Sequence, residues 1–326
     1  MNKNIEIIEY KPEHKKLWED FVDSSNNGTI FHYQKFLDYH TPGKFDFTHY
    51  LFLKNDKLVA VLPGGLNKKN EYWSPVGASY GSIVTKDIHF ELALEIVDSF
   101  IDFCKEKKIN DAYLIPAPLI YNINYSQHLE YAMLYRKCDF ELHYISHAID
   151  LKHNNEFFRH FNNTAKNNIK KIFREGKLTI RESKDYDSFN KILIENKARH
   201  NVKPTHSLED MLKLKELLPD KIRLYLVYYE DKPIAGSLLF ICNKKVVICF
   251  YIMLMYEYQY LNPVYYLMYE TVRWAVENGF EWVDIGVSQD TAAEDPMTPS
   301  LSLISFKERF DSRGILRSTF HFDFKK

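Results

Sequence analysis

The chain has 326 residues, of which 45% are hydrophobic and 27% are charged, so it can form two domains with cores of ordinary globular composition. Its formal net charge of -1 excludes a strongly basic surface, and any anion site must therefore be local. No apolar run reaches the roughly 18 residues of a membrane-spanning helix, and the first residues do not form a signal peptide. We expect a cytoplasmic protein, with peripheral association with a membrane as an open alternative.

The N-terminal half shows alternating strand and helix patterns. We predict strands at residues 5–10, 47–53, 57–66, 77–84, 112–115 and 142–151, and helices at 12–24 and 90–107. Asn55 and Asp56 lie between the second and third strands and are typical of a tight hairpin turn.

The C-terminal half repeats this style without obvious residue identity. We predict helices at residues 164–174, 187–199, 208–217, 263–278 and 301–310, and strands at 179–182, 222–229, 234–241, 246–254, 282–285 and 315–324. Asn262 is expected to cap the helix that starts at Pro263. The pattern indicates an α/β protein with mixed sheets, in two domains packed together, at residues 1–150 and 151–326.

Several segments of the second half resemble the GNAT family of N-acetyltransferases. They are the hairpin at residues 234–254, the helix after it, and the strand that ends in Asp284-Ile-Gly286. The segment Ser305-Phe-Lys-Glu-Arg-Phe310 is similar to the tandem, FemABX-like members, which form peptidoglycan bridges. The resemblance spans nearly the whole chain and implies two tandem GNAT-like domains, of which the second is catalytic.

The resemblance implies transfer of an acyl or aminoacyl group to an amine of a cell-envelope precursor or a related metabolite. The acceptor would be a small molecule or a lipid-linked amine. Acyl-CoA, acyl carrier protein and aminoacyl-tRNA are the possible donors, and no tightly bound cofactor is expected. A plain acetyl-CoA-dependent N-acetyltransferase, and a non-catalytic ligand-binding protein on the same fold, stay open as alternatives.

The turn before the helix at 263–278 departs from the GNAT pattern. CoA-dependent members carry Q/R-x-x-G-x-G/A there, so that backbone amides approach the pyrophosphate. This chain has Gln259, Asn262 and Val264 in that frame, and Pro263 lacks an amide donor. These three residues are the candidate donor-binding positions, and the missing glycines modestly favour aminoacyl-tRNA over acyl-CoA.

Two residues are candidates for catalysis, because acyl transfer to an amine needs a base and donors for an oxyanion. Asp284 follows a central strand and would orient or deprotonate the amine, although an aspartate there is often only a turn residue. Tyr251 lies on the neighbouring strand and would assist the leaving group, although packing in the core is the more common role.

The candidate substrate-binding residues lie in two polar segments. Lys307 and Arg309 are expected to meet acceptor charge, with a solvated helix face as the alternative, and Ser288 lies at a strand end. His200, Lys203 and His206 lie in a polar loop that could line a cleft or be solvated. No third ligand accompanies these histidines and the four cysteines lack zinc spacing, so we predict no metal site.

Overall fold

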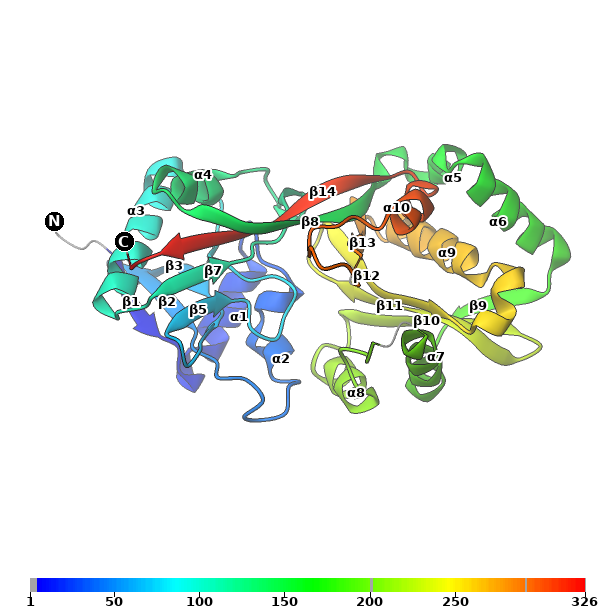
Figure 1. Cartoon of the computed structure of the whole chain (residues 1–326), viewed down its shortest axis with the longest axis horizontal. Coiled ribbons are helices and arrows are strands. Elements are labelled where there is room, and N and C mark those ends of the chain that lie inside the picture. The colour runs from blue at the N-terminus through cyan, green and yellow to red at the C-terminus, as the bar shows by residue number, and fades with distance from the viewer. Residues whose placement is uncertain (1–4, 200–201, 291, 326) are drawn as a thin grey trace. The chain divides into compact units, whose positions relative to one another are not determined.

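A computed structural model describes residues 5–199, 202–290 and 292–325 (Figure 1). The chain forms two compact units. Unit 1 comprises Met1–Tyr144 and Leu316–Lys326, and unit 2 comprises Ile145–Ile315. The sequence suggested a single division after residue 150. In the structure the chain instead passes between the units twice, within β8 (Asp139–Asp150) and within β14 (Ser312–Asp323).

Unit 1 contains a four-stranded antiparallel sheet in the order β1-β2-β3-β6. Its strands are β1 (Ile5–Glu9), β2 (Tyr50–Lys54), β3 (Lys57–Leu62) and β6 (Val84–Thr85). The β2–β3 hairpin turns at Asn55 and Asp56, whose φ angles are 49° and 61°. Asn and Asp tolerate this left-handed region better than other non-glycine residues, which explains the hairpin predicted at this point.

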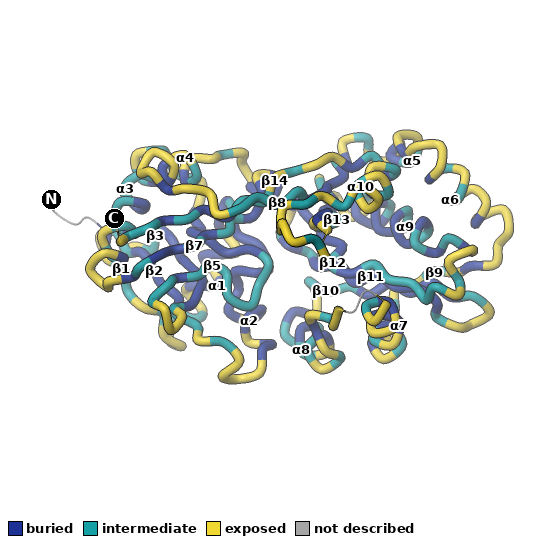
Figure 2. The backbone as a smooth tube through the Cα atoms, viewed as in Figure 1, coloured by how far each residue is buried: buried dark blue, intermediate teal, exposed yellow. Residues whose placement is uncertain are grey.

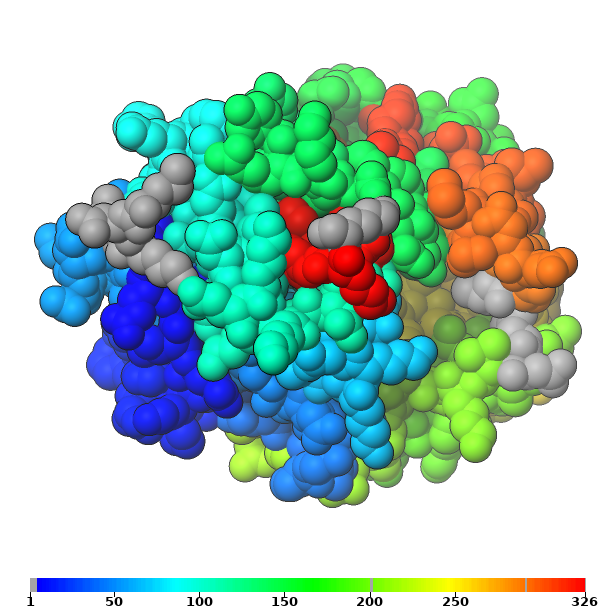
Figure 3. Space-filling view, turned by 60° about the vertical axis from the view of Figure 1, so that its left-hand side comes forward, coloured from blue at the N-terminus to red at the C-terminus, as the bar shows by residue number. Residues whose placement is uncertain are grey.

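A second group of strands in unit 1 includes the C-terminal segment of the chain. β5 (Glu71–Ser74) pairs with β4 (Gly65–Leu66) and runs parallel to β7 (Asp111–Leu114), and β14 pairs antiparallel with β7 through residues 320–323. Phe320 and Phe322 are buried in the unit 1 core. In Figure 3 the red atoms of this segment lie against the cyan atoms of unit 1. The C-terminal strand segment therefore completes unit 1, because Phe320 and Phe322 are buried in that core.

The strand predicted at residues 77–84 is wrong. Only Val84–Thr85 is a strand, and β5, just before it, was not predicted. The segment between them is irregular: Gly77 has φ of 69°, Gly81 N donates to Ile115 O, and Ser82 N donates to the Ser74 hydroxyl. The apolar residues of this segment are buried within an ordered loop, and burial alone produced the strand-like pattern.

Unit 2 contains strands in the order β8-β13-β12-β11-β10-β9. They are β9 (Leu178–Glu182), β10 (Ile222–Tyr229), β11 (Lys232–Ile241), β12 (Val246–Leu254) and β13 (Trp282–Val287). All neighbouring pairs are antiparallel except β12 and β13, which run parallel. The predicted mixed α/β class is confirmed.

Helices cover both faces of this sheet (Figure 1). α6 (Asn163–Glu175) and α9 (Pro263–Glu277) cover one face, and α7 (Tyr186–Ala198) and α8 (Leu208–Leu217) cover the other. Figure 2 shows buried strands and the exposed outer sides of α6 and α7. Gly236 on β11 allows α7 to approach closely, because a Cβ there would lie 2.6 Å from the Phe189 ring.

The remaining helices are mostly short, except α3, whose apolar side is buried in the unit 1 core. They are η1 (Pro12–His14), α1 (Lys15–Asp23), η2 (Ile30–His32), α2 (Gln34–Leu37), α3 (Phe90–Glu106), η3 (Leu119–Tyr121), α4 (His128–Tyr135), η4 (Leu151–Glu156), α5 (Phe157–His160), η5 (Tyr256–Leu261) and α10 (Leu301–Glu308). Among the described residues, no helix has the length and apolar character needed to cross a membrane.

Candidate active site

The parallel pairing between β12 and β13 ends at the candidate site. The ladder joins Val246–Ile248 to Trp282–Asp284, and both strands continue beyond it. On β12, Tyr251 pairs with Leu238 but Cys249 pairs with Leu239, so Phe250 forms a bulge. A bulge redirects the side chains that follow it. The strand ends therefore diverge from a regular sheet where the sequence had placed Asp284 and Tyr251.

β13 is also irregular. Its register with β8 shifts between Asp284 and Val287, and Gly286 has φ of 77°, a conformation that glycine adopts without strain. Asp284 is fully buried, and its Oδ1 accepts hydrogen bonds from Gly286 N at 2.7 Å and from the Ser146 hydroxyl at 3.1 Å. Asp284 is thus a turn residue that fixes this bend, and its burial prevents it from meeting an acceptor amine directly.

Lys307 extends from α10 into the bend. Its Nζ donates to Gly286 O and Val287 O, each at 2.7 Å, and to the Ser288 hydroxyl at 3.0 Å. An ammonium has three donors, and these bonds use all of them. The side chain is only 7% exposed, so the solvated helix face considered as an alternative is wrong.

Burial gives Lys307 an unusual protonation equilibrium. Desolvation lowers the pKa of its ammonium to about 8, against the opposing attraction of the Asp284 carboxylate. The ammonium is thus a cation at neutral pH in a poorly solvated place, where a charge acts strongly on its surroundings. Phe306 and Phe310 hold α10 in position by packing against Tyr265, with ring centroids 5.6 and 5.5 Å apart.

A chain of buried hydrogen bonds continues from Lys307. Ser288 accepts from Lys307, and its oxygen lies 2.9 Å from His147 Nδ1. Because Lys307 can only donate, the Ser288 hydroxyl is able to donate onward to His147. Burial, followed by the charge of Lys307, lowers the pKa of His147, which favours a neutral imidazole able to accept that bond.

Tyr251 and His206 form a separate pair. The Tyr251 hydroxyl lies 2.9 Å from His206 Nδ1 and accepts a 3.3 Å bond from His206 N. Both side chains are buried, and burial raises the pKa of Tyr251. The bulge at Phe250 turns Tyr251 toward the side of α7, where its ring lies 6.4 Å from Phe189. The structure thus brings Tyr251 and His206 together, and His206 is a structural partner of the Tyr251 hydroxyl.

The other predicted substrate-binding residues are dispersed. Arg309 Nη1 donates to the Tyr265 hydroxyl at 2.5 Å, so its cation supports the packing of α10 on α9. Lys203 is exposed, which agrees with the alternative of a solvated loop. His200 lies outside the described residues.

The turn between β12 and α9 keeps the backbone of a glycine turn without the glycine. Asn262 has φ of 58° and ψ of 40°, in the left-handed region where asparagine is the usual substitute for glycine. The expectation that its side chain caps α9 is wrong, because Asn262 has this left-handed backbone and its side chain makes no capping hydrogen bond. Gln259 is exposed and Val264 is partly buried.

A shallow pocket lies beside this turn. Asn262 and Tyr260 line it together with Lys171, Lys177 and Glu175 from the neighbourhood of α6. Glu175 lies 3.8 Å from each of the two lysines, so the carboxylate only partly offsets the two cations. The pocket therefore presents positive charge next to the backbone turn that follows β12.

Sequence reasoning missed Ser146 and His147. Both lie on β8, where alternating residues predicted an ordinary strand. The only signal available was that Ser146 and His147 are two consecutive polar residues in an otherwise alternating stretch. Such a pair gives no indication of a partner on β13 or in the loop after it.

The comparisons with known proteins agree with this geometry. Residues 159–294 match the family described as Acetyltransferase (GNAT) domain. No curated protein sequence matches the chain.

Solved structures share the fold over nearly the full length. A structure titled "Crystal structure of FemX" aligns with a TM-score of 0.70 and 12% identity, covering 98% of this chain and 97% of the other. The C-terminal domain of a putative lysylphosphatidylglycerol synthetase from Agrobacterium fabrum aligns with a TM-score of 0.62 and 11% identity, covering 95% and 91%. A tandem GNAT protein from the clavulanic acid biosynthesis pathway aligns with a TM-score of 0.55 and 7% identity, covering 98% of both chains.

The matched region, residues 159–294, contains the diverging strands, Asp284, Ser288 and the turn at Asn262. Lys307 follows it directly on α10 and reaches back into it through three hydrogen bonds. Residues 159–294 therefore match a GNAT domain, and the chain as a whole shares the fold of the FemX structure, as its sequence motifs had indicated.

Proposed function

We propose that unit 2 transfers an acyl or aminoacyl group to an amine of a cell-envelope precursor or a related metabolite. The observation that carries this proposal is the buried Lys307 ammonium, fixed at the diverging end of β12 and β13 by three hydrogen bonds. The similarity to a putative lysylphosphatidylglycerol synthetase favours an aminoacyl group, because the product of that protein is a lysyl-bearing lipid by its name.

The reaction creates two electrostatic demands. The acceptor nitrogen attacks the acyl carbonyl, a C–N bond forms, and the C–O or C–S bond to the donor breaks. The carbonyl oxygen becomes an oxyanion on the way, and the nitrogen loses a proton that finally reaches the leaving group or solvent. A fixed positive potential lowers the energy of the oxyanion, and this is often the largest single contribution to acyl transfer.

In this proposal Lys307 supplies the potential without touching the acceptor. Its three N–H groups remain bonded to Gly286, Val287 and Ser288, and its charge polarises the amides of this bend. Asp284 positions the bend and balances the buried charge. The imidazole of His147, which is neutral near pH 7, accepts a hydrogen bond from the Ser288 hydroxyl and thereby keeps that hydroxyl oriented.

The pocket beside Asn262 is the proposed donor-binding position. Acyl-CoA, acyl carrier protein and aminoacyl-tRNA all carry phosphate groups, and Lys171 and Lys177 offer cations beside the turn. Pro263 has no N–H, and Val264 is larger than glycine, so fewer backbone amides are able to approach a pyrophosphate. We therefore place aminoacyl-tRNA ahead of acyl-CoA as the donor.

The decisive experiment is a donor screen with the purified chain. Acetyl-CoA, longer acyl-CoA, acyl carrier protein and a set of aminoacyl-tRNAs are each offered with a panel of amine acceptors, and amide formation is followed by mass spectrometry. We expect turnover with at least one donor and loss of most of it in Lys307→Met. No amide product with any donor, or full turnover by Lys307→Met, would contradict the proposal.

Calorimetry separates the two leading donors. Acetyl-CoA is the second candidate donor, because residues 159–294 match an acetyltransferase (GNAT) domain. Saturable acetyl-CoA binding that weakens several-fold in Lys171→Ala/Lys177→Ala would favour an acetyltransferase. Competition by tRNA, with no acetyl-CoA binding, would favour aminoacyl transfer.

A further inference from the structure

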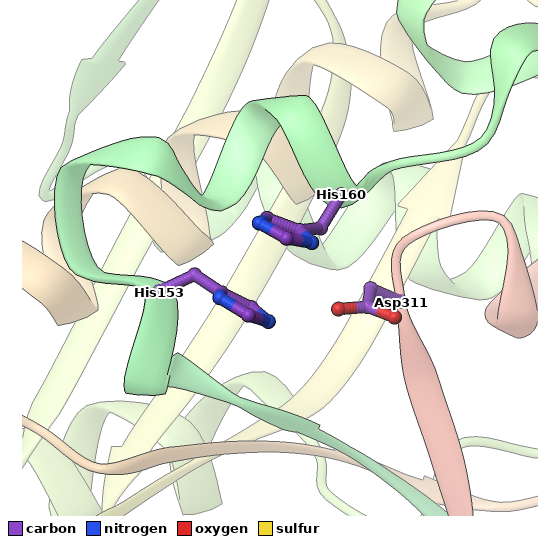
Figure 4. A group of neighbouring side chains, drawn as sticks. All are labelled: His153, His160 and Asp311. Carbon is purple, nitrogen blue, oxygen red and sulfur yellow. The ribbon is translucent and has the colours of Figure 1, made fainter.

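Three side chains outside the candidate active site converge on one point of unit 2. His153, His160 and Asp311 each offer one ligand atom, and these atoms all lie within 4.8 Å of one another. Figure 4 shows both imidazoles side by side with the Asp311 carboxylate directed toward them. We propose that these three residues bind a divalent first-row transition-metal ion, for which Zn²⁺ is the natural probe.

The fold brings these residues together for reasons independent of their side chains. Phe161 follows His160 and Phe310 precedes Asp311, and these two buried rings pack perpendicularly with centroids 5.3 Å apart. A backbone bond of 2.9 Å from Asn162 N to Arg309 O joins the same two segments. His160 and Asp311 are therefore held as neighbours by the core beneath them.

His153 reaches the same point by a sharp change in chain direction. It lies in η4, and the next residue, Asn154, has φ of 46° and ψ of -127°, which interrupts the helical path before α5 begins. As a result the His153 and His160 rings stack, with centroids 3.4 Å apart and an angle of 8° between their planes. Strained backbone of this kind is found where a structure must aim a side chain.

The donor set suits a borderline transition metal. Imidazole nitrogen together with one carboxylate oxygen is a frequent ligand set for zinc and its neighbours, whereas calcium and magnesium prefer oxygen alone. Bonds of about 2.0–2.1 Å place tetrahedral ligands about 3.4 Å apart, so the side chains need only a modest closure around the ion. His160 is exposed, and its ring can turn to direct a nitrogen at the ion.

The surroundings leave room for the ion. Arg313 Nη2 pairs with one Asp311 oxygen at 2.9 Å, but the Arg313 side chain is 73% exposed, so this is a weak surface pair that a divalent cation can displace. Three protein ligands leave at least one position for water. The ion would tie the chain that opens unit 2 to the turn after α10, which carries Lys307.

Metal titration tests this inference separately from acyl transfer. Calorimetry with Zn²⁺ at pH 7.5 should give one site per chain with micromolar affinity, and Co²⁺ should produce visible d–d absorption. His153→Ala, His160→Ala and Asp311→Asn should each weaken binding at least tenfold, while Mg²⁺ should not bind. The matched control is His89→Ala, because His89 is exposed on unit 1 and lies outside the cluster.

Circular dichroism of the metal-free variants verifies that they are folded, which is expected because His160 is exposed and the other two are only partly buried. Absence of saturable binding at Zn²⁺ concentrations up to about 100 times the expected micromolar dissociation constant would overturn the proposal. Equal binding by wild type and all three variants would overturn it as well.

Discussion

Two buried histidines, one in each unit, show how the environment distinguishes a structural role from the chemical role that we propose. In unit 1, His32 Nδ1 accepts from Thr29 N at 2.8 Å and its Nε2 lies 3.0 Å from Gly81 O. In unit 2, His147 Nδ1 lies 2.9 Å from the Ser288 hydroxyl, which Lys307 also contacts. Both side chains are about 1% exposed, so burial alone does not distinguish them.

The difference lies in the partners. Backbone groups have fixed donor and acceptor roles, so the Thr29 amide and the Gly81 carbonyl lock one neutral tautomer of His32. A hydroxyl both donates and accepts, so Ser288 links His147 to a cation whose own protonation changes near neutral pH. We therefore expect changes at His32 to alter stability and changes around His147 to alter turnover.

The largest effect is expected from Lys307→Met. Losing the cation should lower turnover at least about 100-fold, because it removes preorganised charge at the proposed oxyanion. It should also lower the free energy of unfolding by about 2–4 kcal/mol, because buried oxygens of residues 286–288 lose their donor. Amide formation and urea unfolding measure the two effects. Lys105→Met, an exposed lysine-to-methionine change in unit 1, is the control.

Acid should affect unit 1 through His32. Burial lowers the pKa of its imidazole to about 4, whereas the unfolded chain takes up that proton near pH 6.5. The contribution of neutral His32 is thus fully present above pH 6.5 and is lost between pH 6.5 and 4, up to about 3 kcal/mol. Urea midpoints at pH 7.5 and 4.5 measure it, and a His32→Leu variant with the same pH dependence as wild type would contradict this assignment.

His32→Leu at neutral pH is the next largest change. The variant leaves the buried Thr29 N–H and Gly81 carbonyl without their partner, so we expect a loss of about 2 kcal/mol in unfolding free energy. Turnover per folded molecule should be unchanged. A fall in turnover beyond twofold at a temperature where the variant is fully folded would break the distinction between the two histidines.

The smallest effects are expected from Ser288→Ala and His147→Gln. Each should lower turnover about tenfold, and the double variant should lose little more, because residues acting in one chain are not additive. Wild-type activity should also decline above pH 8, as the Lys307 ammonium deprotonates. Two outcomes would contradict the coupling of His147 to Lys307 through Ser288. One is strictly additive losses of turnover in the double variant, and the other is full activity of Ser288→Ala with an unchanged pH profile.

The sequence predicted the secondary structure of unit 2 well, because its central strands are continuous apolar runs and α6 and α9 each have an apolar side. α9 is the best example: Pro263 begins it, as predicted, Leu267 and Met268 are buried, and Arg273 forms ion pairs with Glu270 and Glu277. It failed at residues 77–84, where an irregular loop is buried as deeply as a strand. Periodicity reports burial and cannot distinguish the two when the loop is short.

The candidate site was only partly predictable. Asp284, Ser288 and Lys307 follow recognisable motifs, and the structure does gather them around Gly286. Ser146 and His147 could not be found, because their partners come from a distant part of the chain. The bulge at Phe250 changes the face of the sheet on which Tyr251 lies, and an apolar strand has no sequence signal for such a register change. The same long separation hid Asp311 from His153 and His160.

The double passage of the chain through β8 and β14 has a consequence for biosynthesis. All of unit 2, Ile145–Ile315, emerges from the ribosome before Phe320 and Phe322, which unit 1 needs for its core. The later-encoded unit is therefore the first that can close completely, while the earlier one waits with an apolar surface open at β7. Order of synthesis and order of completion are reversed in this molecule, and a fragment that stops at residue 315 would carry a finished unit 2 beside an unfinished unit 1.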